Sequence, residues 1–216
     1  MPLIMKNLLA AVKEVKSQSA ERKFSQSIEL AMNLQNIDMK KPEGKIQERI
    51  ELPFSIGKEV KVCVIATGEM ALNAQKAGAS LVIERATLEG LAADKKKQKD
   101  IAKEYDVFIA EAPLMPLVGK NLGASLGPRG KMPTPIAPNA DIKEQIMKNQ
   151  NVVFIRTRAQ PVIQCRVATE SMPDNEIAEN VQAVVKRIES KLKRGIKNVK
   201  TVYLKTSMGP SIKVAM

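Results

Sequence analysis

Apolar and polar residues follow two different periods in the first quarter of the chain. Over residues 3–18 the apolar positions recur every three or four residues, which predicts an amphipathic helix. Residues 28–34 and 46–52 instead alternate between apolar and polar, the pattern of strands with one buried face. Residues 39–44, between them, are charged and contain proline and glycine, so a loop is expected. We therefore predict that the two strands pair as an antiparallel hairpin across this loop.

The middle of the chain has the pattern of a parallel sheet. Residues 60–66 are apolar apart from Lys61, which is typical of a strand covered on both faces. Short apolar runs follow at 81–83 and 107–110. Helix-like stretches separate and follow these runs, at residues 69–77, 87–104 and 114–124. This β-α-β-α-β order predicts parallel strands with helices on both faces.

The last third returns to strands with one buried face. Residues 126–138 contain four prolines and are expected to form a loop before a short helix at 139–149. Strand character is then found at 152–157, 162–168 and 199–206. Between the last two, a strongly amphipathic helix is predicted to begin at Asp174 or Asn175 and to stop at Gly195.

These patterns predict two domains on a discontinuous plan. The expected fold is an α+β terminal domain, residues 1–66 and 156–216, into which an α/β three-layer, Rossmann-like domain, residues 67–155, is inserted. The charges divide in the same way. The inserted part carries 12 basic and 10 acidic residues, and the remainder carries 23 and 13. The net charges of +2 and +10 place the expected anion-binding surface mostly on the terminal domain.

The whole chain carries a formal net charge of +12, which indicates a polyanionic partner such as RNA, DNA or an anionic membrane surface. No apolar run approaches the length that spans a membrane, and the first residues lack the pattern of a secretion signal. We expect a cytoplasmic protein that is a monomer when free. Aromatic residues are only 3% of the chain, so both cores must be aliphatic.

The residue types needed for most catalysis are missing. The chain has no histidine, and Cys63 and Cys165 each lie in an apolar run, so buried free thiols are expected and no zinc or other metal site. The glycine-rich residues 123–131 do not fit a phosphate-binding loop, and no dinucleotide pattern follows the strand at 60–66. We therefore expect no cofactor and no enzymatic activity, with a nucleotide-dependent enzyme as the disfavoured rival.

Two fingerprints are specific enough to suggest a family. Residues 126–133 read Leu-Gly-Pro-Arg-Gly-Lys-Met-Pro, and residues 205–210 read Lys-Thr-Ser-Met-Gly-Pro. In this order and spacing they resemble the ribosomal protein L-one family, the protein of the mobile stalk beside the tRNA exit site. The resemblance covers essentially the whole chain, and residues 40–43 and 114–117 look like the archaeal branch.

The resemblance implies a structural constituent of the large ribosomal subunit that binds large-subunit rRNA. It also implies contact with exit-site tRNA, help in tRNA release, and repression of translation through binding to the leader of the protein's own mRNA. The alternative is a ribosome-assembly factor with the same domain. Such relatives carry longer charged tails, whereas this chain ends almost at its last strand, which favours the ribosomal component.

The same resemblance assigns the RNA-binding residues, chiefly on the terminal domain. They are Lys23, Phe24, Ser25, Gln26, Ser27, Arg156, Arg158, Gln164, Arg166, Lys205, Thr206, Ser207, Met208, Gly209 and Pro210. At the positions of Arg158 and Gln164 bacterial relatives carry an acidic residue or a histidine. A secondary RNA contact or a hinge is expected at Thr67, Gly127, Arg129, Gly130 and Lys131.

Each residue type suits the assigned role, and each has a plainer alternative. A glycine at 209 lets the backbone approach RNA, and Phe24 and Met208 offer apolar surface to a base or ribose. Phe24 could instead cap the core, and residues 208–210 could be only a turn. For residues 127–133 a structural loop or hinge is favoured over direct RNA contact. The expected hinge lies where the chain crosses between domains, near Ala66-Thr67 and Arg156-Thr157.

Overall fold

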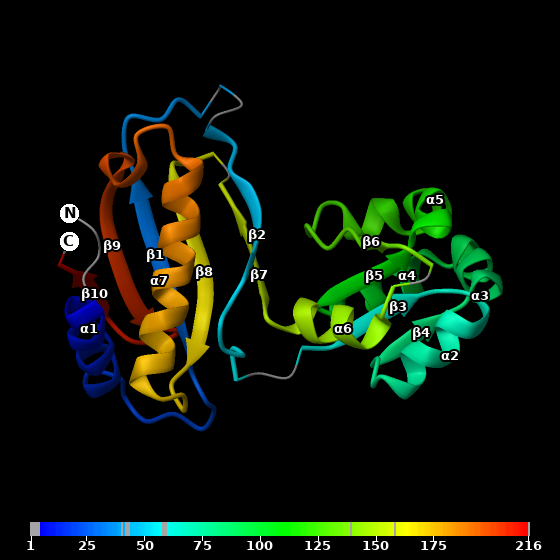
Figure 1. The fold of residues 1–216 in the computed structure, drawn as a ribbon, viewed down its shortest axis with the longest axis horizontal. Helices are drawn as coiled ribbons and strands as arrows, with labels where there is room; N and C mark the ends of the chain where they lie inside the picture. The colour runs from blue at the N-terminus through cyan, green and yellow to red at the C-terminus, as the bar shows by residue number, and fades with distance from the viewer. Residues whose placement is uncertain are drawn as a thin grey trace. The chain divides into compact units, whose positions relative to one another are not determined.

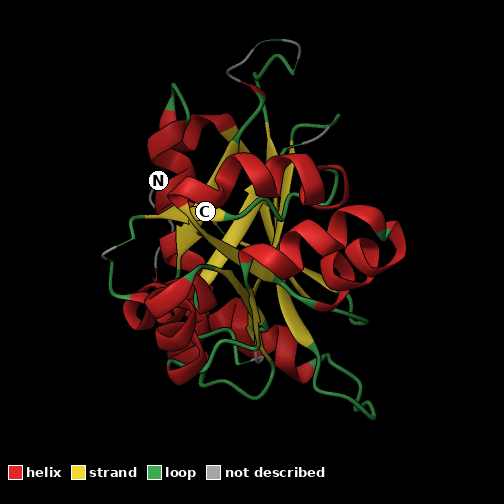
Figure 2. Ribbon diagram, turned by 90° about the vertical axis from the view of Figure 1, so that its right-hand side faces the viewer, coloured by secondary structure: helices red, strands yellow, loops and turns green. Residues whose placement is uncertain are grey.

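The computed structural model describes residues 5–39, 41, 44–57, 60–138, 140–157 and 159–215. It divides into two compact units. The terminal unit is formed by Met1–Lys58 and Asn151–Met216, and the middle unit by Glu59–Gln150. Figure 2 shows the helices and strands of both units coloured by class. Within the described residues, no helix is long and apolar enough to cross a membrane.

The terminal unit is built on a four-stranded antiparallel sheet in the order β10-β9-β1-β8. The strands are β1 (Ser27–Leu34), β8 (Val162–Thr169), β9 (Val199–Thr206) and β10 (Ser211–Val214). Helices α1 (Met5–Ser17) and α7 (Asp174–Lys191) pack together on one face of this sheet (Figure 1). Every second residue of β1 is buried under them, since side chains alternate between the two faces of a strand.

The predicted hairpin is wrong. Strand β2 (Gln47–Glu51) pairs with β7 (Val152–Arg156), while β1 lies between β8 and β9. The alternation along β1 fixed which face is buried, but it carries no information about neighbours. Partners that are more than a hundred residues away in sequence take both edges of β1.

Helix α7 starts and stops slightly differently from the prediction. Asp174 lies inside its first turn and forms an ion pair with Lys16 of α1 at 2.7 Å, rather than capping the helix through its side chain. The helix ends at Lys191, and a short 3-10 turn, η4 (Gly195–Asn198), leads into β9. The predicted apolar stripe is buried as expected, from Ile177 to Ile188.

The middle unit contains the predicted parallel sheet, in the order β4-β3-β5-β6. Its strands are β3 (Val62–Ile65), β4 (Leu81–Ile83), β5 (Val107–Glu111) and β6 (Thr134–Ile136). On one face pack α3 (Arg85–Gly90), η2 (Leu91–Ala93), α4 (Lys95–Glu104), η3 (Ala112–Leu114) and α5 (Met115–Leu126). On the other pack α2 (Gly68–Lys76) and α6 (Ile142–Gln150).

Two details of the middle unit differ from the prediction. The lysine-rich stretch forms two helices instead of one, because the Asp94 carboxylate accepts the backbone N–H groups of Lys96 and Lys97 and so starts α4 anew. The proline-rich stretch expected to be a loop contains the edge strand β6, in which Pro135 lies at a sheet edge where its missing N–H does no harm.

The unit boundaries lie a few residues before the predicted ones. The predicted boundary after residue 66 would leave β3 in the terminal domain, but β3 pairs with β4 and β5 and so belongs to the middle unit. Strand β7 belongs to the terminal unit because it pairs with β2. Backbone pairing, which sequence composition does not show, decides both assignments.

Candidate nucleic-acid interface

The start of β1 and the end of β9, the two inner strands, meet at one end of the antiparallel sheet. Ile28 lies opposite Thr206 in the ladder, and the backbone N–H of Ser207 donates to the Ser27 carbonyl at 3.0 Å. On the other side of β1, Ser27 lies opposite Thr169. Residues 23–27 and 205–210, separated by most of the chain, therefore lie side by side. We refer to these two segments together as the strand-end surface.

Gln26 holds the two segments of the strand-end surface together from inside. Its side-chain amide donates to Ser19 Oγ at 2.9 Å and to the Ala20 carbonyl at 3.0 Å. Its Oε1 accepts the backbone N–H of Met208 at 3.1 Å. Gln26 and Thr206 are each only 1% exposed. The assignment of these two side chains as RNA contacts is thus corrected by burial: both position the surface rather than form it.

The aromatic and thioether groups point outward instead. Phe24 is 54% exposed and Met208 is 64% exposed, which makes them two of the most exposed large hydrophobic side chains in the described part of the chain. The plainer alternative, that Phe24 caps the core, is contradicted by this exposure. Beside Phe24 is an open hollow of about 540 Å³, bordered also by Lys16, Lys23 and Glu170. Ser25 and Pro210 are exposed as well.

Gly209 is required by the turn itself. A Cβ atom at this position would lie 2.3 Å from Thr206 Oγ1, closer than any real contact. The turn is closed by the Gly209 N–H, which donates to the Thr206 carbonyl at 3.3 Å. The glycine therefore fixes how Met208 and Pro210 are presented, whether or not the backbone also approaches a ligand.

The sheet face opposite α1 and α7 extends the strand-end surface along β1. Glu29 of β1 lies between Arg166 of β8 and Lys205 of β9 in the ladders. Lys213 on β10 and the exposed Gln164 on β8 belong to the same face by alternation. Sequence reasoning missed Glu29, Asn33, Thr201, Tyr203 and Lys213 on this face. The alternation of the strands would have found them, had the pairing been known.

One predicted residue, Arg156, lies away from the strand-end surface. Arg156 is exposed at the end of β7, opposite Gln47, and the chain from there leads to the start of β8 beside Asn33, at the far end of β1 from Ser27. Arg156 therefore lies apart from the strand-end surface, and its predicted phosphate contact stays a prediction. Arg158 lies outside the described residues.

Thr67 makes contacts wholly within the middle unit. Its backbone N–H and its hydroxyl both donate to one carboxylate oxygen of Glu111, at 3.1 and 2.9 Å. This carboxylate lies where β3 and β5 end, the edge at which parallel α/β sheets hold bound phosphates. A fixed negative charge at this position disfavours a nucleotide there, in agreement with the sequence argument against a nucleotide-dependent enzyme.

The glycine-rich loop at 127–131 is tied to α4 by its two cations. Lys131 Nζ donates to the carbonyls of Tyr105 at 2.6 Å and Ala102 at 3.2 Å, and Arg129 donates to the Lys99 carbonyl at 3.4 Å. Partial burial lowers the pKa of Lys131. These bonds satisfy carbonyls at the end of a helix, which favours the structural alternative for this loop.

The expected hinge positions are corrected by the same contacts. Thr67 and residues 127–131 lie inside the middle unit, and Thr157 is buried in the terminal unit, where its hydroxyl donates to the Gly44 carbonyl at 2.7 Å. The chain passes between the units at residues 58–59 and 150–151 instead. The positions predicted to bend, Thr67 and Thr157, are therefore each held by hydrogen bonds within one unit.

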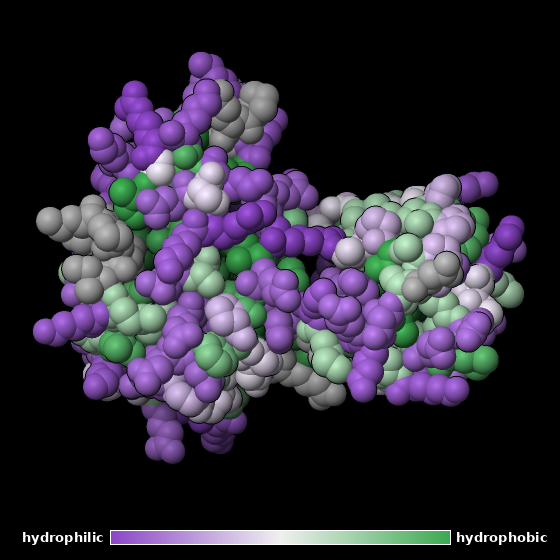
Figure 3. All heavy atoms as spheres, in the orientation of Figure 1, coloured by the Kyte–Doolittle hydropathy of each residue, from purple (hydrophilic) through white to green (hydrophobic). Residues whose placement is uncertain are grey.

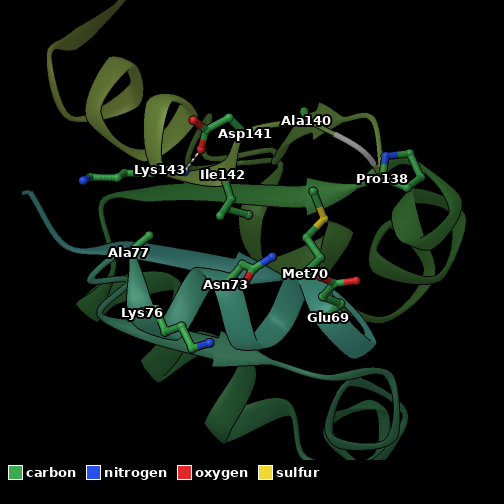
Figure 4. A pocket seen from close by; sticks show the side chains of 10 residues that line it. All are labelled: Glu69, Met70, Asn73, Lys76, Ala77, Pro138, Ala140, Asp141, Ile142 and Lys143. Carbon is green, nitrogen blue, oxygen red and sulfur yellow. Dashed lines mark hydrogen bonds between the residues drawn. The ribbon is translucent and has the colours of Figure 1, made fainter.

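Figure 4 shows a hollow between α2 and α6 of the middle unit. Met70 and Ile142 form its apolar part. Its charged side chains balance, with Glu69 and Asp141 against two lysines, Lys76 and Lys143. It has neither the charge excess nor the aromatic surface of a nucleic-acid site. Among the described residues, no group of three or more Cys, Asp or Glu side chains is placed to hold a metal ion.

The sequence profile of the Ribosomal protein L1p/L10e family matches residues 5–210. The chain belongs to this family. The matched range includes both segments of the strand-end surface, so the resemblance drawn from the two fingerprints is confirmed. The expectation of a non-enzymatic protein is confirmed by the same membership.

Relatives match over nearly the full length of the chain. A protein of Methanocella arvoryzae is 45% identical over 209 residues, covering 97% of this chain and 98% of the relative. One of Pyrococcus abyssi is 45% identical over 215 residues, covering 99% and 98%. One of Methanosarcina acetivorans is 44% identical over 212 residues, covering 98% and 100%. Each carries the name large ribosomal subunit protein uL1, and these relatives are archaeal, as the branch-specific segments indicated.

Proposed function

We propose that this protein is a structural component of the large ribosomal subunit that binds large-subunit rRNA through the strand-end surface. One observation carries the proposal: Gln26 joins the first and last segments of the terminal unit at a place where Phe24 and Met208 are both exposed. Membership of the family and the relatives that bear the name large ribosomal subunit protein uL1 support it.

The surface combines the groups that folded RNA requires. Phe24 and Met208 offer apolar surface against which a base or a ribose packs. The Ser207 hydroxyl, partly exposed beside them, suits a 2′-OH or a phosphate oxygen. Lys23, Arg166 and Lys205 place positive charge around these groups, and such contacts fix register on the RNA without reading its sequence.

The two units take the roles expected from the charge division. The terminal unit is the discontinuous α+β RNA-binding domain, and the middle unit is an inserted α/β three-layer, Rossmann-like domain. In this proposal the protein is a monomer when free, contacts exit-site tRNA in the ribosome, and represses its own translation by binding the leader of its mRNA. Titration of the leader transcript tests the last point, and binding no tighter than to unrelated RNA would contradict it.

Filter binding to large-subunit rRNA fragments over a series of salt concentrations tests the proposal as a whole. We expect a selected fragment to bind with a steep negative salt slope. Met208→Ala should weaken that complex about tenfold or more, since full burial of a methionine side chain contributes about 1.5–3 kcal/mol. Met147→Ala is the matched control, because Met147 is a methionine of the middle unit with 51% exposure. Equal affinities of the two variants would refute the proposed surface.

A further inference from the structure

A second concentration of positive charge lies at the end of α7. From Ser190 to Met216 the chain has seven basic residues and no acidic one. Those at the end of α7, in η4 and at the start of β9 are all exposed: Lys191, Lys193, Arg194, Lys197 and Lys200. Hydrophilic side chains dominate this end of the terminal unit (Figure 3).

The cationic cluster continues into a groove between α7 and β2. An open hollow of about 550 Å³ is bordered by Arg49, Lys186 and Arg187, with Glu51 as its one acidic residue. Arg187 and Lys191 both form ion pairs with Glu48 of β2, at 3.2 and 2.8 Å, which joins the groove to the end of the helix. We call the groove and the cluster together the distal basic surface.

The distal basic surface is separate from the strand-end surface. Helix α7 begins at Asp174, which pairs with Lys16 beside the hollow next to Phe24, and it ends at Lys191. A helix of 18 residues is about 27 Å long. An RNA segment that contacts only the strand-end surface therefore does not also contact the distal basic surface.

The helix dipole explains only part of this charge. Cations near the C-terminus of a helix stabilise it, but the effect fades beyond the last turn. Lys191 lies within that turn, whereas Lys197 and Lys200 lie past it, in η4 and β9. The helix dipole therefore does not explain why residues 197 and 200 are basic, nor why no acidic residue lies near them in the sequence.

We propose that the distal basic surface binds the phosphate backbone of a second RNA segment, so that the terminal unit holds RNA at both ends of α7. The inference rests on the proposed function, which places the protein against RNA. Arginine and lysine together suit phosphate oxygens. An acidic protein is the less fitting partner, since of the large hydrophobic side chains exposed in the described residues none lies on this surface to anchor one.

Fluorescence anisotropy with a labelled 20-nucleotide oligouridylate tests the distal basic surface over a salt series. The test variant replaces Lys193, Arg194, Lys197 and Lys200 by glutamine. The matched control replaces Lys95, Lys96, Lys97 and Lys99 of α4, which removes the same charge from the exposed face of another helix. We expect the test variant to bind at least about tenfold more weakly at roughly 100 mM salt, with a log–log salt slope shallower by about 2–3, because each lost phosphate contact removes about 0.7. The control should keep the wild-type slope.

Three results would overturn the proposal. The first is a test variant with the slope and affinity of the wild type. The second is a control that loses as much affinity as the test variant. The third is labelled polyglutamate binding the wild-type chain more tightly than oligouridylate does, which would indicate an acidic protein partner. The selected rRNA fragment separates this proposal from the proposed function. The distal variant should still show the Met208-dependent complex, whereas failure of the strand-end surface would appear as fragment binding insensitive to Met208→Ala.

Discussion

Replacing Gln26 by leucine would test whether the two segments of the strand-end surface must be held together. Leucine is close to glutamine in size, so the change removes the side-chain hydrogen bonds while leaving little empty space. Three bonds are lost: those from the amide to Ser19 and Ala20, and the one that Oε1 accepts from the Met208 N–H.

The expected magnitude follows from these bonds. A net contribution of about 1 kcal/mol for each predicts that the terminal unit loses about 3 kcal/mol of unfolding free energy. The effect on RNA binding has a second origin. Residues 207–209 lose their anchor to Gln26, and RNA must then order them, at about 1 kcal/mol for each residue. The total of about 3 kcal/mol corresponds to an affinity for the selected rRNA fragment that is on the order of 100-fold lower.

Urea unfolding followed by circular dichroism measures the first effect, and filter binding measures the second. Gln98→Leu is the matched control. Gln98 is a buried glutamine of the middle unit, 6% exposed, whose amide donates to the Leu91 and Ala92 carbonyls at 2.7 and 3.4 Å. The Gln98→Leu variant should be less stable than the wild type but should bind RNA with the same affinity. If Gln26→Leu is destabilised as predicted but binds RNA like the wild type, the reasoning about preorganisation is refuted.

Three further predictions concern the turn, the loop and the thiols. Gly209→Ala places a Cβ against Thr206, so it should destabilise the terminal unit by about 1–3 kcal/mol and weaken RNA binding at least about tenfold. The control Gly119→Ala has open space around the new Cβ in α5 and should do neither. If the two variants have equal stability in calorimetry and equal RNA affinity in filter binding, the turn geometry is contradicted. Lys131→Met removes the hydrogen bonds to the Ala102 and Tyr105 carbonyls at the end of α4. The change should destabilise the middle unit by about 1–3 kcal/mol in calorimetry while RNA affinity stays unchanged. Lost RNA affinity in a fully stable variant would argue for direct contact instead. Burial raises the pKa of the Cys63 and Cys165 thiols from 9.0 to about 12, so between these pH values the folded state retains protons that the unfolded chain releases. The unfolding free energy should therefore be undiminished below pH 9 and should fall as pH rises from 9 to 12, by up to about 1.4 kcal/mol per pH unit for each thiol. An equally steep fall in a variant with both cysteines replaced by alanine would contradict this prediction.

The sequence predicted faces better than it predicted neighbours. Alternation along β1 identified its buried side, and the apolar stripe of α7 was buried as expected. The hairpin failed because alternation is a property of one strand, while pairing depends on which distant strand completes the core. The observed unit boundaries differ from the predicted ones for the same reason, since the hydrogen-bonded partners of β3 and β7 decide to which unit each strand belongs.

The candidate site shows the same division between residue type and role. Of the two fingerprints, only residues 205–210 lie on the strand-end surface, where Met208 is exposed, as is Phe24 of the neighbouring segment. Their use in RNA binding stays a prediction. Gln26 and Thr206 share those segments but face inward, and a one-dimensional motif does not separate a residue that forms a surface from one that supports it. For the loop that contains Lys131 a structural role was favoured over RNA contact, and the Lys131 hydrogen bonds to the Ala102 and Tyr105 carbonyls at the end of α4 fit that role.

Hydrogen exchange measured by mass spectrometry, with and without the selected rRNA fragment, tests most directly whether both chain ends form one binding surface. The backbone amides of residues 23–27 and 205–209 should become protected together, to a similar degree and at the same RNA concentration. Protection of one segment alone, or protection confined to residues 59–150, would contradict the account.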